Sequence, residues 1–122
     1  MSHPLDRAVW NALTTRLSGF VTRDSDARAV RIDPEVGVFL SGADASPETV
    51  AVMADLASGH PGAGMVELSG GPMAELDLPG IERVSRIPLV QMTCAALTPG
   101  GPDLAHQTLT EADAPEMLAL PF

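Results

Sequence analysis

The chain of 122 residues has no lysine, no tyrosine and a single cysteine, Cys94. Its seven arginines stand against sixteen aspartates and glutamates, which gives a formal net charge of −9. Nucleic acids and anionic membranes require Lys and Arg to meet their phosphates, so this charge argues against both as partners. One cysteine cannot close an internal disulfide, and the apolar run around Cys94 predicts a buried thiol.

Targeting signals and membrane spans are also lacking. No stretch approaches the ~20 apolar residues that span a bilayer. The first ten residues contain no apolar core of signal-peptide length. We therefore expect a cytoplasmic location and no membrane partner.

Two segments have the pattern of helices. In the first, apolar residues recur at helical spacing up to a stop at Gly19, with Trp10 at the core rim or, alternatively, as an anchor for a partner. In the second, Ser46 is the expected cap, Pro47 the first helical residue and Gly59 the end. The apolar stripes expected to be buried are Leu5, Ala8, Val9, Ala12, Leu13 and Leu17 in the first helix, and Val50, Met53, Ala54 and Ala57 in the second.

Strands are predicted between and after these helices. Residues 29–33 and 36–40 alternate around a turn at 33–35 and predict a hairpin or a bent strand. Residues 65–68 predict a short strand, and 69–80 a loop in which Met73 and Leu76 can pack. Residues 81–96, interrupted by Pro88, predict two strand segments with Val90, Met92 and Cys94 on one face. This order predicts an α/β (α+β) fold, in which two main helices pack on a small mixed, largely antiparallel sheet.

The C-terminal region has the pattern of a linker followed by the start of a second domain. A Pro/Gly linker at 98–103 closes a predicted domain of residues 1–103, and residues 104–122 predict a strand followed by a helix. Asp113 is the expected cap, Pro115 lies in the first turn, and Glu116 follows three residues after the cap. A helix of two turns before Pro121 is too short to be stable alone, so an ordered tail has to dock on something.

Chemistry-bearing residues are dispersed. The glycine run 59–64 follows a helix and leads into a strand, which is the reverse of a phosphate loop and favours a plain turn. Three isolated histidines in loops favour surface positions over a metal site: they are His3, His60 and His106. Cys94 has no neighbouring base, and the serines lack the glycine-flanked elbow of hydrolases: they are Ser41, Ser58 and Ser69.

The charged side chains do not single out an active site either. A general base among the scattered carboxylates is possible but cannot be identified; the candidates are Asp24, Asp26, Asp33, Glu35 and Asp44. Arg83 and Arg86 can either meet an anionic ligand or form surface ion pairs. We therefore assign no catalytic, cofactor-binding or metal-binding residue.

Several stretches nevertheless resemble a bacterial group of GNAT-type N-acetyltransferases: residues 2–15, 33–37, 88–92 and 111–120. In that group a poorly marked N-terminal lobe precedes the catalytic lobe, whose start residues 104–122 resemble. The family grips acetyl-CoA with an Arg/Gln-x-x-Gly-x-Gly/Ala turn between a strand and a helix. Here Gly59 stands where that turn needs Arg or Gln, and Cys94 replaces a required Gly in 91–96. The tyrosine that many of these enzymes use as general acid is missing.

The resemblance implies a non-catalytic N-terminal lobe or fragment that binds no cofactor itself. A full-length parent would transfer acetyl from acetyl-CoA to an amine. The implied partner is the catalytic lobe of the same polypeptide, or a second copy in a homodimer, held through the C-terminal segment. The alternatives are a stand-alone binding or dimerisation module and a small complete enzyme using scattered Asp, Glu, Arg or Cys94. The lobe hypothesis predicts exposed apolar surface at Leu109, Met117, Leu118 and Leu120.

Overall fold

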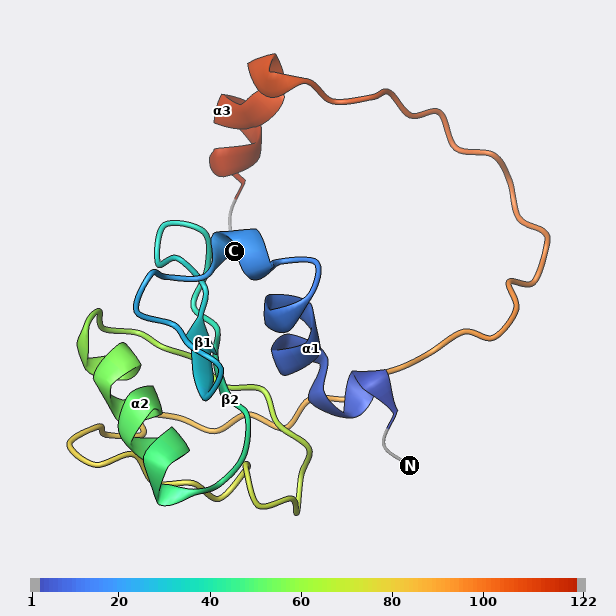
Figure 1. Ribbon diagram of the computed structural model, residues 1–122. Coiled ribbons are helices and arrows are strands. Elements are labelled where there is room, and N and C mark those ends of the chain that lie inside the picture. The colour runs from blue at the N-terminus through green and yellow to red at the C-terminus, as the bar shows by residue number, and fades with distance from the viewer. Residues whose placement is uncertain (1–2, 121–122) are drawn as a thin grey trace. The chain divides into compact units, whose positions relative to one another are not determined.

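A computed structural model describes residues 3–120 (Figure 1). The described residues fall into two units, divided between Arg86 and Ile87. The first unit contains nearly all the regular structure: 3-10 helices η1 (Pro4–Arg7) and η2 (Ser18–Phe20), helices α1 (Ala8–Thr14) and α2 (Pro47–Ser58), and strands β1 (Ala29–Arg31) and β2 (Leu40–Gly42). The second contains η3 (Glu111–Asp113) and α3 (Ala114–Leu118). The predicted mixed helix-and-strand class with a small antiparallel sheet is confirmed.

Strands β1 and β2 form the predicted hairpin, with Val30 opposite Ser41. The second strand lies at Leu40–Gly42 instead of the predicted 36–40. The reason is a longer turn: the carbonyl of Asp33 accepts hydrogen bonds from the amides of both Val36 and Gly37. Regular pairing therefore starts later than the alternation suggested.

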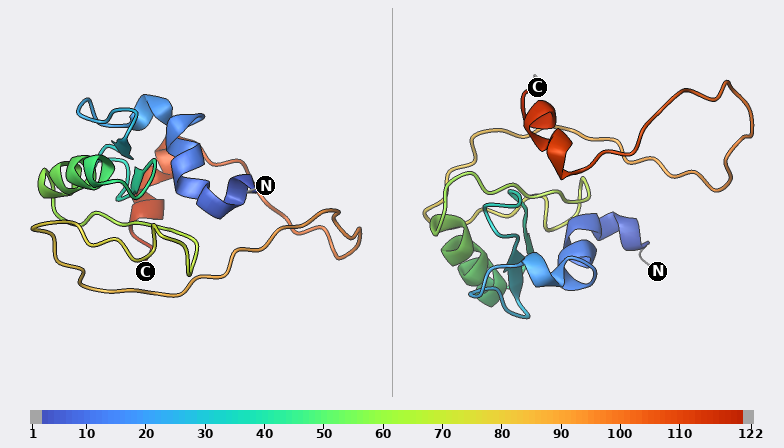
Figure 2. Two further views of the ribbon diagram at one scale, coloured as in Figure 1. Left: turned by 60° about the horizontal axis from the view of Figure 1, so that its bottom comes forward. Right: turned by 90° about the horizontal axis from the view of Figure 1, so that it is seen from above.

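The two helices lie on opposite faces of this hairpin, an arrangement seen in all views (Figures 1 and 2). Because side chains alternate along a strand, β1 supplies both faces. One core cluster gathers around α2 and the other around α1. The first contains Ala29, Leu40, Met53, Leu56, Ala57 and Met73, and the second Leu13, Val30 and Ile32. Met73 and Leu76 pack as predicted, and Trp10 is half-buried at the rim of the α1 cluster.

Helix α2 begins and ends where the sequence predicted. The Ser46 hydroxyl accepts a hydrogen bond from the Thr49 amide at 3.3 Å, and Gly59 is the C-terminal cap. The buried face is shifted from the expected one: Met53 and Ala57 are buried as predicted, whereas Val50 and Ala54 are only partly buried. Thr49 and Leu56 are buried in addition. The helix can be rotated in this way because the Thr49 hydroxyl donates to Asp44 at 2.7 Å, so a polar residue is satisfied inside.

The first helix is shorter than predicted. It starts as η1, continues as α1 and ends at Thr14, five residues before Gly19. The hydroxyls of Thr14 and Thr15 bond to backbone carbonyls four residues earlier, which competes with a regular helix end. Leu5 and Leu17, expected in the buried stripe, are 37% and 38% exposed.

Two predicted strand regions are not strands within residues 3–120. In the first region, Gly64 forms an isolated bridge with Phe39, and residues 65–68 have no regular secondary structure. Residues 81–96 form no strand, and Cys94, expected to be buried, is exposed. A strand forms only when a neighbouring segment accepts and donates its backbone hydrogen bonds. The high β-propensity of residues 81–96 does not by itself produce a strand.

In the second unit the predicted helix exists as η3 followed by α3, but no strand precedes it in 104–110. Pro115 lies in the first turn of α3 as expected. Asp113 occupies the cap position, yet its carboxylate accepts from the Thr110 amide at 2.8 Å and so caps η3 instead. The predicted stop at Pro121 lies outside the described residues.

Across residues 3–120, every helix is too short or too polar to cross a lipid bilayer.

Candidate functional site

The first site is built around Arg7, the last residue of η1. Its Nε and Nη2 donate to the two carboxylate oxygens of Glu67 at 3.2 and 2.8 Å, which is the paired geometry in which guanidinium and carboxylate match best. The Glu67 side chain is only 5% exposed and that of Arg7 24%. This is a largely buried ion pair between residues sixty positions apart.

The remaining donors of Arg7 bind the end of β2. Nη2 donates to the carbonyl of Gly42 at 2.6 Å and to the Ser41 hydroxyl at 3.2 Å, and Nη1 donates to the carbonyl of Ala43 at 3.2 Å. The guanidinium carbon also lies 5.5 Å from the centre of the Trp10 ring, within cation–π distance. Since every nitrogen of Arg7 is engaged, this residue ties η1 to the sheet and is not free to bind a ligand.

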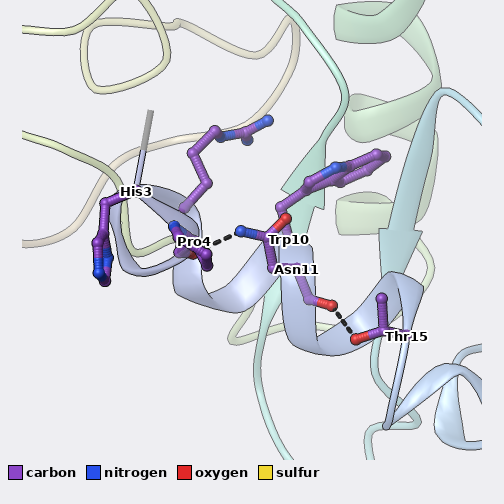
Figure 3. Close-up of a pocket in the computed structure, with 6 residues that line it drawn as sticks. His3, Pro4, Trp10, Asn11 and Thr15 are labelled. Carbon is purple, nitrogen blue, oxygen red and sulfur yellow. Dashed lines mark hydrogen bonds between the residues drawn. The ribbon is translucent and has the colours of Figure 1, made fainter. Parts of the chain in front are cut away.

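A hollow of about 590 Å³ lies beside it (Figure 3). Figure 3 shows His3 and Trp10 at opposite ends of the hollow, with Asn11 between them. The polar groups here serve local backbone: the Asn11 side chain donates to the Pro4 carbonyl, and the Thr15 hydroxyl donates to the Asn11 carbonyl. The ring of His3 accepts from the Leu5 amide. These contacts leave a surface hollow without an organised set of reactive groups.

A second, smaller hollow of about 110 Å³ lies at the C-terminal end of α2. Arg31 of β1 is one of its lining residues and is 2% exposed. Its Nη1 donates to the carbonyls of Leu56 and Ala57 in the last turn of α2. The other lining residues are Thr22, Asp24, Pro34, Leu56, Gly59 and His60.

The glycine run 59–64 follows α2 as predicted, but it ends at an isolated bridge between Gly64 and Phe39 and does not lead into the predicted strand. Gly59 caps the helix, and the backbone of Gly64 bonds in both directions, its amide to Val38 at 2.7 Å and its carbonyl to the Leu40 amide at 2.9 Å. A pyrophosphate would meet this run at the negative end of the α2 dipole, where an anion is disfavoured. The residues therefore do not fit the phosphate-binding turn of an acetyltransferase.

Within the described residues, the hydrogen bonds of the three histidine rings all involve backbone groups. Residues 3–120 contain no group of three or more His, Cys, Asp or Glu side chains that could hold a metal. The exposed Cys94 thiol donates to the carbonyl of Ala96 at 3.1 Å. Among the candidate serines, Ser41 joins Arg7 and Glu67, and Ser58 bonds the Asp55 carbonyl.

The candidate carboxylates and arginines are mostly local structural groups. Hydrogen bonds from Ser46 and Thr49 lower the pKa of Asp44 to about 2, so this group is a poor base. Asp26 and Asp33 accept from backbone amides in their own turns. Arg86 forms a surface ion pair with Glu75 at 2.8 Å, which is one of the two alternatives predicted for it. This pairing lowers the pKa of Glu75.

Reasoning from the sequence missed Arg7, Glu67 and Arg31. The Arg7–Glu67 pair left no local signal because its members are remote in sequence. Arg31 did leave one: the period of two places it on the same face as Ala29, so a charge inside the sheet could have been noticed. Comparisons with models of protein families, with characterised proteins and with solved structures find no match for this chain.

Proposed function

We propose that this chain is the non-catalytic N-terminal lobe of a GNAT-type N-acetyltransferase. In this proposal a longer parent polypeptide transfers acetyl from acetyl-CoA to an amine in the cytoplasm. The catalytic lobe binds the cofactor, and the present chain supports that lobe through its second unit.

The observation that carries the proposal is the exposure of apolar side chains in the second unit. Every Val, Leu, Ile and Met of residues 87–120 is at least half exposed, from 50% at Met117 to 88% at Val90. The four residues singled out from the sequence belong to this set, with 52% at Leu109, 84% at Leu118 and 60% at Leu120. So many exposed apolar side chains in one segment are typical of a place where another protein surface binds.

Two further features favour a non-catalytic lobe over an enzyme. The glycine run is unsuited to a pyrophosphate because it follows the C-terminal end of α2 and its Gly64 amide is already bonded. Hydrogen bonds from Ser46 and Thr49 at the start of α2 lower the pKa of Asp44 and hold this carboxylate as an anion. General-base catalysis near neutral pH needs the opposite shift.

Isothermal titration calorimetry with acetyl-CoA tests the cofactor part. We expect no binding heat from residues 1–122. A dissociation constant in the micromolar range would show that this chain carries a cofactor site of its own and would overturn the proposal.

The reading frame tests the lobe part independently. We expect the coding sequence to continue past codon 122 into a segment with the Arg/Gln-x-x-Gly-x-Gly/Ala turn. A stop codon directly after codon 122 would contradict this. Light scattering then tests the alternative: a concentration-dependent dimer that buries the second unit would favour the stand-alone dimerisation module.

A further inference from the structure

Arg31 is the one charged residue buried in the core of the described residues, at 2% exposure. Buried charges are normally paired, because removing an ion from water is costly. The ion pairs formed within residues 3–120 are Arg7–Glu67 and Arg86–Glu75, and neither involves Arg31. A buried guanidinium in this position therefore lacks its usual carboxylate.

Within the described residues, the Arg31 guanidinium donates hydrogen bonds through one of its three nitrogens. Its hydrogen bonds within the described residues all come from Nη1, which donates to the carbonyls of Leu56 and Ala57. These carbonyls are the negative end of the α2 dipole and partly offset the charge. Nε is buried and finds no acceptor in the described part of the chain. A guanidinium presents its donors as a planar fork, so Nε and its neighbouring Nη form an edge suited to one carboxylate.

The hollow that Arg31 helps to line is of matching size. Its volume of about 110 Å³ is roughly three to four times the share of one water molecule in the liquid. This is room for a carboxylate with a short carbon chain and too little for a nucleotide. Pro34 and Leu56 offer apolar wall for the carbon chain, and Thr22 and His60 offer polar groups at the same hollow.

We propose that this hollow, the Arg31 pocket, binds a small monocarboxylate through the Arg31 guanidinium. The pocket lies wholly within the first unit and is independent of the function proposed above. The bound anion would supply the negative charge that Arg31 lacks in the described part of the core.

Asp24 is the competing group, because this acidic residue also lines the pocket. It opposes an incoming anion while it remains apart from Arg31, and it would replace the anion if it moved onto the guanidinium. Asp24→Asn separates the two possibilities. A free ligand predicts tighter binding in this variant, since one repelling charge is gone.

The wild-type chain can be tested directly by NMR, with acetate as the probe and sodium chloride at matched ionic strength as the control. Arg31→Lys assigns the Nε–H signal of Arg31, and Arg83→Lys is the matched control, because Arg83 also donates to a backbone carbonyl, that of Leu76, but is not among the residues lining the pocket. We expect the Arg31 signal to shift saturably, with a midpoint on the order of millimolar. Acetate should raise the melting temperature of wild type and of Arg83→Lys, and not that of Arg31→Lys.

Three results would overturn the proposal. The first is no saturable shift up to about 100 mM acetate, which would mean that the hollow holds only water. The second is saturation by inorganic phosphate at a tenfold lower concentration than by acetate, which would make the ligand class wrong. The third is an Asp24→Asn variant that is destabilised in the absence of acetate, which would identify Asp24 as the native partner of Arg31. Several-fold tighter acetate binding by Asp24→Asn, with an unchanged melting temperature in the absence of acetate, would support the pocket.

Discussion

Replacing Arg7 by methionine isolates the energetic role of the buried ion pair that joins η1 to the sheet. The substitution keeps an unbranched apolar stem of similar length and removes the guanidinium. Glu67, whose side chain is 5% exposed, then loses its cation, and the carbonyls of Gly42 and Ala43 lose donors. The remaining carboxylate is left in a largely dry environment.

Breaking a buried pair by removing one partner costs about 3–5 kcal/mol in unfolding free energy. Arg7 is 24% exposed, so water can partly replace it, and we expect a loss near the lower bound, about 3 kcal/mol. For a unit of this length 1 kcal/mol corresponds to roughly 4–8 °C, so the melting temperature should fall by about 12–24 °C. A domain stability of roughly 0.05–0.15 kcal/mol per residue makes this a large share of the total.

The assay is urea unfolding followed by far-UV circular dichroism, because fluorescence of Trp10 would be altered locally by the substitution. Arg86→Met is the matched control: its partner Glu75 is 62% exposed and Arg86 51% exposed, so the loss should stay below about 1 kcal/mol. The double variant Arg7→Met/Glu67→Leu should be more stable than Arg7→Met alone, since it removes the stranded charge. Equal losses in Arg7→Met and Arg86→Met would refute this reasoning.

Three further predictions concern other parts of the chain. Gly42→Ala should lower the unfolding free energy by about 1–3 kcal/mol, because a Cβ there would lie 2.8 Å from Thr49 Cγ2; Gly19→Ala, with open space around it, should change it little. An NMR titration should give Asp44 a pKa of about 2 against an ordinary 3.8. The contribution of Asp44 to stability is then complete above pH 3.8 and is lost as the pH falls through about 2. An ordinary pKa would contradict the hydrogen bonds that Asp44 accepts from Ser46 and Thr49. Leu118→Ser, at a position 84% exposed, should change the unfolding free energy of this chain by no more than about 0.5 kcal/mol; a larger loss would mean that α3 already packs.

Sequence signals succeeded where the relevant interactions are local. Helix α2 was predicted at both ends because its cap, its first-turn proline and its terminal glycine act within a few residues. The hairpin followed from alternation around a proline turn. Its exact second strand did not, because two amides bond to one Asp33 carbonyl and lengthen the turn.

The failures are of another kind. Residues 81–96 have strand-like composition, but a strand is completed by its neighbour, and the sequence of one segment does not reveal whether a neighbour exists. Thr49 was not predicted on the buried face of α2 because threonine is polar. Its hydroxyl can be buried because it donates a hydrogen bond to Asp44. For the candidate sites, the Arg7–Glu67 pair depends on chain topology alone, whereas the buried Arg31 was readable from strand alternation.

We propose that the second unit is an apolar docking segment for a catalytic lobe. Hydrogen exchange of the amides in residues 87–120 tests this role most directly, measured in this chain and in the longer parent polypeptide that the proposal requires. We expect exchange near the rate of an unfolded chain for 87–110 in this chain alone, and protection by at least tenfold in the longer polypeptide. Strong protection of 87–110 in a monomer of this chain, equal to that in the longer polypeptide, would contradict the docking role.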